Sequence, residues 1–177
     1  AATPISVEPP LDPGAVYYQR LLAGDEAEAS ELLERYLTEG SPPETLYDAL
    51  MLPALNLAQD DRSEGRLSEE EERGVIDATR ELLLEVDTAE SAASEGPQQV
   101  PPETETASAS SIGILGYPAN GEADVLALRM LGKVLEATPL RLEIMPRPGL
   151  WSEVVEQVKA KGYRVVCIAD LPPSAPS

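Results

Sequence analysis

The sequence contains no histidine among its 177 residues, and Cys167 is its only cysteine. Histidine is the commonest general base and metal ligand in proteins, so its absence excludes Ser-His-Asp and Cys-His catalytic sites. One cysteine cannot form an internal disulfide or supply a zinc or iron–sulfur site, and it is typical of a reducing compartment. We therefore expect a chain that is not an enzyme and holds no metal.

Aromatic residues are also scarce, at 4% of the chain with no phenylalanine and one tryptophan, although 42% of the residues are hydrophobic. The core must therefore be built from Leu, Val, Ile and Ala. This composition favours an α or α/β fold over an aromatic-rich β-sandwich. No apolar run approaches the roughly 18 residues of a membrane-spanning helix.

Positive charge is scarce in the first part of the chain. Residues 1–107 carry 25 acidic and 6 basic side chains, whereas residues 108–177 carry 7 of each, and the formal net charge is −19. Such an acidic surface repels phosphate backbones and anionic lipids, so we expect no nucleic acid partner. Two interpretations of the acidic part stay open: a solvated surface that serves solubility, or a docking face.

The first part predicts a four-helix bundle over residues 13–90, after a linker at residues 1–12. Its clearest helix spans residues 25–39, where apolar residues recur at the spacing of one helix face. Ser68 and Glu71 form the capping box of another helix, and Pro53 predicts a kink or an unpaired carbonyl. Short connections between amphipathic helices indicate an antiparallel arrangement.

A flexible linker rich in Ala, Ser, Thr, Glu and Pro is expected at residues 91–110, and residues 111–177 then change pattern. The near-continuous apolar runs 111–117 and 163–169 predict strands buried on both faces, with a third strand at 140–145. Helical stripes lie between them. The order βαβαβ predicts a partial doubly wound parallel sheet, and we expect this domain to continue beyond residue 177.

Glu122 and Asp124 fall near the start of the helix after the first strand. This is the edge at which doubly wound sheets bind ligands, but complementarity to the helix dipole favours helix capping as the role of both residues. A weaker alternative makes them an acid/base pair of an enzyme. Cys167 lies in a strand pattern and is interpreted as a small hydrophobe.

Two parts of the sequence resemble cobalamin-binding modules, in which a helical cap covers the corrin and a flavodoxin-like domain holds its other face. Residues 52–55 (Leu-Pro-Ala-Leu) and 65–72 resemble the last two cap helices, and residues 121–130 resemble the first βα loop and helix of the cobalamin domain. In this family a histidine ligates cobalt from below, and here Asp124 occupies its position. The resemblance also places Arg62 and Arg73 at the cap–domain cleft, where they would bind an anion or pair with surface carboxylates.

A closer resemblance is to the C-terminal extension of autoinducer-2-exporter-like permeases, carried by residues 18–25, 79–82 and 118–124. It implies a cytoplasmic regulatory or interaction module, tethered to the inner membrane by the membrane domain of the same polypeptide and able to self-associate. Because the cobalt-ligating histidine is absent, we expect no bound cofactor. The alternative is a genuine cobalamin sensor with non-histidine ligation. The candidate cleft residues are Arg62, Arg73, Glu122 and Asp124.

Overall fold

The computed structural model describes residues 12–38, 42–94 and 112–171. The first part contains α1 (Pro13–Leu22), α2 (Glu26–Thr38), α3 (Pro43–Leu46), the π-helical turn η1 (Tyr47–Met51), α4 (Leu52–Ser63) and α5 (Glu69–Ser94). The second part contains β1 (Ile112–Pro118), α6 (Glu122–Leu135), β2 (Leu140–Ile144), α7 (Trp151–Lys161) and β3 (Val165–Ala169).

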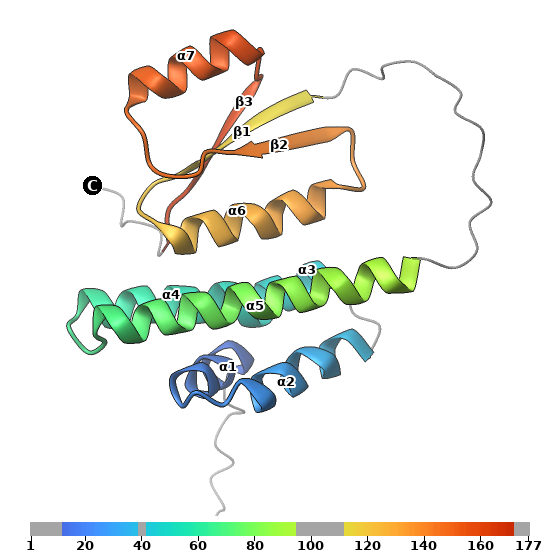
Figure 1. The fold of residues 1–177 in the computed structure, drawn as a ribbon, viewed down its shortest axis with the longest axis vertical. Coiled ribbons are helices and arrows are strands. Elements are labelled where there is room, and N and C mark those ends of the chain that lie inside the picture. Colours follow the sequence, from blue (N-terminus) through green and yellow to red (C-terminus); the bar gives the residue numbers. More distant parts are fainter. Residues whose placement is uncertain (1–11, 39–41, 95–111, 172–177) are drawn as a thin grey trace, which may run out of the picture.

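The elements form layers (Figure 1). The three strands are parallel in the order β2-β1-β3, with Ile112 opposite Leu140 and Ile114 opposite Val165. Helix α7 covers one face of the sheet, and α6 covers the other face and lies between the sheet and the bundle (Figure 1). The prediction of a helical cap-like bundle followed by a partial doubly wound parallel sheet is confirmed.

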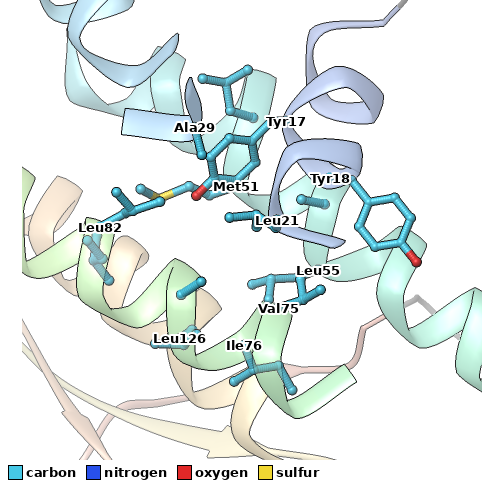
Figure 2. Close-up of a cluster of buried hydrophobic side chains, with 14 of the residues drawn as sticks. Tyr17, Tyr18, Leu21, Ala29, Met51, Leu55, Val75, Ile76, Leu82 and Leu126 are labelled. Atoms are coloured by element: carbon cyan, nitrogen blue, oxygen red, sulfur yellow. The ribbon is translucent and has the colours of Figure 1, made fainter. Parts of the chain in front are cut away.

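One hydrophobic cluster joins the bundle to the second part of the chain. Ala123, Leu126 and Met130 of α6 are buried in the same cluster as the apolar faces of the bundle helices. Figure 2 shows Leu126 beside Val75 and Ile76 of α5. Because α6 contributes one side of its surface to this cluster and another to the sheet, burial of its apolar residues fixes the bundle against the sheet.

Pro53 alters the third bundle helix, where the sequence predicts a kink or an unpaired carbonyl. Proline has no N–H and its ring clashes with the carbonyl four residues earlier, which here belongs to Ala49. The chain adopts the π-helical turn η1 just before it, and the N–H of Leu52 donates to the carbonyl of Tyr47. Gly14 of α1 packs against this turn, where a Cβ would lie 2.5 Å from Pro53 Cβ and 3.1 Å from the Ala49 carbonyl oxygen.

The start of α5 carries the predicted capping box. The N–H of Ser68 donates to Glu71 Oε2 at 2.8 Å, and the N–H of Glu71 donates to Ser68 Oγ at 3.2 Å. Hydrogen bonds to the Glu71 carboxyl from the Ser68 side chain and from the Ser68 backbone hold the pKa of that carboxyl below its usual range. The capping box thus satisfies two N–H groups that a helix start leaves without partners.

The end of α5 differs from the prediction. A linker was expected from residue 91, but the helix continues to Ser94, so the first four residues of that segment are helical. They include Ala92 and Ala93, and alanine has the highest helix propensity of all residues, which extends the helix without an apolar stripe. The rest of the expected linkers, at residues 1–11 and 95–110, lies outside the described residues.

The two apolar strands differ in burial. Residues 114–118 of β1 are buried, as predicted for a central strand. The prediction that residues 163–169 are buried on both faces is wrong within the described residues, because β3 is an edge strand and Val165, Val166 and Ile168 are 48%, 37% and 52% exposed. Across the described ranges, no helix combines the length and apolar character needed to span a membrane.

Candidate functional site

A cleft of about 440 Å³ lies where the end of α4, the start of α5 and the loop before α6 meet. We call it the interdomain cleft. Its position matches the carboxyl edge of β1, where doubly wound sheets bind ligands. Its lining is mostly polar: Gln59, Arg62, Ser63, Glu69, Glu72, Arg73, Ile76, Asn120, Gly121 and Glu122.

The two arginines that were predicted as cleft residues line this cleft from the bundle side. Arg62 Nε lies 3.5 Å from Glu72 Oε2, and Arg73 donates to Glu69 Oε1 at 2.7 Å. Both arginines therefore line the cleft and also pair with carboxylates. With Glu69, Glu72 and Glu122 present, the lining holds three acidic and two basic side chains, so the cleft is not a strongly basic anion site.

Glu122 lines the same cleft from the first turn of α6. Its Oε2 accepts a hydrogen bond of 2.5 Å from Arg80 of α5, and Arg80 also pairs with Asp77 on its own helix. Partial burial would lower the pKa of Arg80, but the hydrogen bonds that Arg80 donates to Asp77 and Glu122 outweigh burial and raise it. Glu122 thus forms part of the contact between bundle and sheet domain as well as part of the cleft.

Asp124 is placed differently, because it is fully buried and does not line the cleft. Its Oδ2 accepts the N–H of Asn120 at 2.7 Å and its Oδ1 accepts the N–H of Leu171 at 2.9 Å. The Asn120 side chain in turn donates to Asp170 Oδ1 at 2.7 Å. Asp124 therefore joins the loop after β1 to the segment after β3.

The structure brings three of the four predicted site residues together: Arg62, Arg73 and Glu122. Glu122 is 68% exposed at its side chain and Asp124 is fully buried, so the two carboxylates do not share one site and do not form an acid/base pair. Among residues 12–38, 42–94 and 112–171, no cluster of three or more potential metal ligands occurs.

Three polar lining residues were not singled out in the sequence: Gln59, Ser63 and Asn120. Asn120 follows a buried strand and precedes a helix, and a polar residue at that point of a βα unit is a signal that could have identified it. Gln59 and Ser63 sit on α4 beside Arg62 and carry no such signal, because their role depends on how the bundle packs against α6.

Comparison with known proteins bears on the bundle. Residues 15–84 match the family model of the B12 binding domain. The matched segment begins in α1 and ends in α5, so the bundle is similar to the B12 binding domain, and the sheet lies outside the match. No curated protein matches the sequence.

The solved structures that are similar to this chain include the methanol:cobalamin methyltransferase complex MtaBC from Methanosarcina barkeri. The identity is 14% and the TM-score 0.44, with 95% of this chain and 61% of that chain covered. This chain therefore spans about three fifths of the length of that protein. A TM-score below 0.5 does not establish a common function.

Proposed function

We propose that this chain is a non-catalytic regulatory or interaction module of a membrane permease, in which the interdomain cleft receives a small polar ligand or a partner surface. The observation that carries the proposal is the cleft itself, in which Arg62, Arg73 and Glu122 converge from the bundle and from α6. Its volume of about 440 Å³ falls in the range of small-molecule sites, about 300–1,000 Å³.

The residues present do not fit cobalamin held in the way of the family that the bundle resembles. The resemblance of residues 121–130 puts Asp124 at the position of the cobalt-ligating histidine, and Asp124 is buried with both carboxylate oxygens accepting backbone N–H groups. A carboxylate is also a harder ligand than imidazole and suits other metals better. The chain has no histidine elsewhere to replace it.

The link to a permease is supported by the resemblance of residues 18–25, 79–82 and 118–124 to the extensions of autoinducer-2-exporter-like permeases. In this proposal the module is cytoplasmic, its partner is the membrane domain of the same polypeptide, and self-association is a further role of its surface. The net charge of −19 keeps the module away from the anionic cytoplasmic leaflet to which it is tethered.

Fractionation of cells that produce the natural gene product tests the tether. An antibody against this chain should detect it in the membrane pellet, and protease added to inside-out vesicles should degrade it, whereas right-side-out vesicles should protect it. Recovery of the whole product in the soluble fraction, without proteolysis, would overturn the permease proposal.

A genuine cobalamin-binding module is the second candidate function. The match of residues 15–84 to the B12 binding domain favours it. In that case cobalamin binds between bundle and sheet domain without a histidine ligand. Retention of corrin by the purified protein separates the two candidates.

A further inference from the structure

A second cleft of about 430 Å³ lies on another side of the contact between bundle and sheet domain. We call it the basic cleft. It is bounded by the middle of α5, the second half of α6 and the edge strand β2, and it shares no lining residue with the interdomain cleft. Figure 1 shows α6 between β2 and α5 along this side.

Positive charge is concentrated in the basic cleft. Four of the 13 basic residues of the chain line it, namely Arg80, Arg129, Lys133 and Arg141, against two acidic residues, Asp87 and Glu136. A chain with a formal net charge of −19 thus has a local excess of positive charge at this site. A concave, partly apolar surface focuses such a field and attracts anions.

Two of the four cations in the basic cleft pair with no carboxylate among the residues that the structure describes. Lys133 lies 3.3 Å from Asp87 Oδ1 and from Glu136 Oε1, and Arg80 pairs with Glu122. Arg129 forms no ion pair with the residues that the structure describes, and Arg141 donates to the backbone carbonyls of Thr138 and Leu140 at 3.1 and 2.9 Å. Their guanidinium groups retain donors suited to a carboxylate.

The rest of the basic cleft is apolar. Leu140, Leu142 and Ile144 alternate along β2 and are half-buried, and Leu84 of α5 is 55% exposed. Gly132 of α6 opens the space above the strand, because the atom nearest to a Cβ built there is Leu142 Cδ2 at 3.7 Å. The cleft therefore combines an apolar floor with guanidinium groups at its rim.

We propose that the basic cleft binds a small amphipathic carboxylate, with its apolar part on the β2 leucines and Leu84 and its carboxylate on Arg129 and Arg141. Arginine forms paired hydrogen bonds with carboxylates, and these are stronger than neutral ones. The volume suits one small organic ligand. A compact monoanion fits better than a polyphosphate, because Asp87 and Glu136 repel a high negative charge.

Such a ligand contacts the bundle through α5 and the sheet domain through α6 and β2. The ion pairs Arg80–Glu122 and Lys133–Asp87 cross the same contact. A ligand that binds only when the bundle and the sheet domain are in contact stabilises that contact by mass action. The basic cleft is thus a second regulatory site, and it stands whether or not the interdomain cleft has the function proposed above.

Isothermal titration of the 177-residue chain with octanoate, and separately with 1-octanol, tests this inference at low ionic strength. Octanoate should bind and the neutral alcohol should bind at least about tenfold more weakly, because a hydrogen bond to a charged group is lost. Arg129→Gln and Arg141→Gln should each weaken octanoate binding by a similar factor.

Gly132→Leu fills the cleft without changing a charge and should abolish octanoate binding. Gly74→Leu is the matched control for Gly132→Leu, since Gly74 is a helical glycine with open space around it. Arg73→Gln is the matched control for Arg129→Gln and Arg141→Gln, because it removes an arginine that lines the interdomain cleft instead of the basic cleft. Both controls should bind octanoate as the unmodified chain does. Circular dichroism confirms that each variant is folded.

Three results of the titrations would overturn the inference: no octanoate binding by the unmodified chain, equal affinity for 1-octanol, or unchanged affinity in both arginine variants. Amide shifts of Gly132 and Leu142 on titration, read by NMR, provide a measurement that does not depend on the variants. Shifts confined to Asn120 and Gly121 would place the ligand in the interdomain cleft and contradict the assignment to the basic cleft.

Discussion

The carboxylate of Asp124 accepts a hydrogen bond of 2.9 Å from the N–H of Leu171, although the two residues are 47 positions apart in the sequence. Because Asp124 also accepts the N–H of Asn120, one buried side chain fixes both loops at the carboxyl edge of the sheet. The buried Asp124 carboxylate thus has a structural role in holding these two segments.

Asp124→Asn should therefore destabilise the chain. The amide oxygen can accept one of the two N–H groups, but the amide NH₂ then faces the other, so a buried donor loses its partner at a cost of about 1–3 kcal/mol. Urea unfolding measures the change. Glu156→Gln, at an exposed carboxylate of α7, is the control, and its free energy of unfolding should stay within about 0.5 kcal/mol of that of the unmodified chain. Equal stability of the two variants would contradict the structural role of Asp124.

Gly14→Ala should destabilise the bundle by about 1–3 kcal/mol, the usual cost of overpacking. Alanine favours a helix over glycine, but a Cβ at this position would lie 2.5 Å from Pro53 Cβ. Gly74→Ala has open space around the added methyl group and should instead stabilise the chain, by up to about 1 kcal/mol. Thermal unfolding shows whether the two substitutions change stability in opposite directions. If Gly14→Ala stabilised the chain, α1 would not pack against the Pro53 turn.

The Tyr18 hydroxyl donates to Asp61 Oδ2 at 2.7 Å and links α1 to α4. The hydrogen bond from Tyr18, followed by that from Arg66, holds the pKa of Asp61 below its usual range. The contribution of Asp61 to stability is therefore full above the ordinary carboxyl pKa of about 4 and is lost as the pH falls through the lower folded-state value.

Tyr18→Phe should lower the free energy of unfolding by about 1 kcal/mol at pH 7 and reduce this acid-dependent loss. Urea unfolding at pH 7 and at pH values below 4 measures both effects. Tyr36→Phe is the control, because Tyr36 is a half-buried tyrosine that forms no hydrogen bond with the described residues. An unchanged pH profile in Tyr18→Phe would contradict the assigned cause of the Asp61 shift.

The bundle and the sheet domain should unfold together, because α6 is buried in the bundle core and also packs on the sheet, where Leu128 lies next to Gly116. Leu126 is 1% exposed, and Leu126→Ala should lower the free energy of unfolding by about 2–5 kcal/mol. Circular dichroism reports mainly the bundle helices, and fluorescence of Trp151 reports the sheet domain, where its ring stacks on Tyr117 at 5.1 Å. The two signals should give coincident urea transitions, both shifted by Leu126→Ala and neither by Val155→Ala, which is 47% exposed in α7. Separate transitions would show that the contact does not couple the two parts.

Local patterns predicted most of the fold, since each depends on residues close in the sequence. The apolar stripe of α2 and the capping box of Ser68 and Glu71 both appear in the structure. Next to Pro53 the structure has a π-helical turn, which the sequence did not specify. The order of strands and helices, together with the right-handed crossover rule, was enough to predict the parallel sheet.

Features that depend on packing were not predicted correctly. The exposure of Val165 and Ile168 follows from the place of β3 at the sheet edge, which the apolar pattern of that strand does not encode. The basic cleft joins Arg80, Arg129 and Arg141, which are far apart in the sequence and meet only because α6 lies between α5 and β2. The same holds for Asp124, whose burial depends on the segment after β3.

The central claim is that this cobalamin-binding-like module does not hold cobalamin. Incubation of the chain with hydroxocobalamin and with adenosylcobalamin, followed by gel filtration and visible spectroscopy, tests it most directly. Because Asp124 is buried and engaged by two backbone N–H groups, the account predicts a colourless protein fraction. Corrin absorbance that co-elutes with the protein at a stoichiometric level would contradict the account and make the chain a cobalamin sensor with non-histidine ligation.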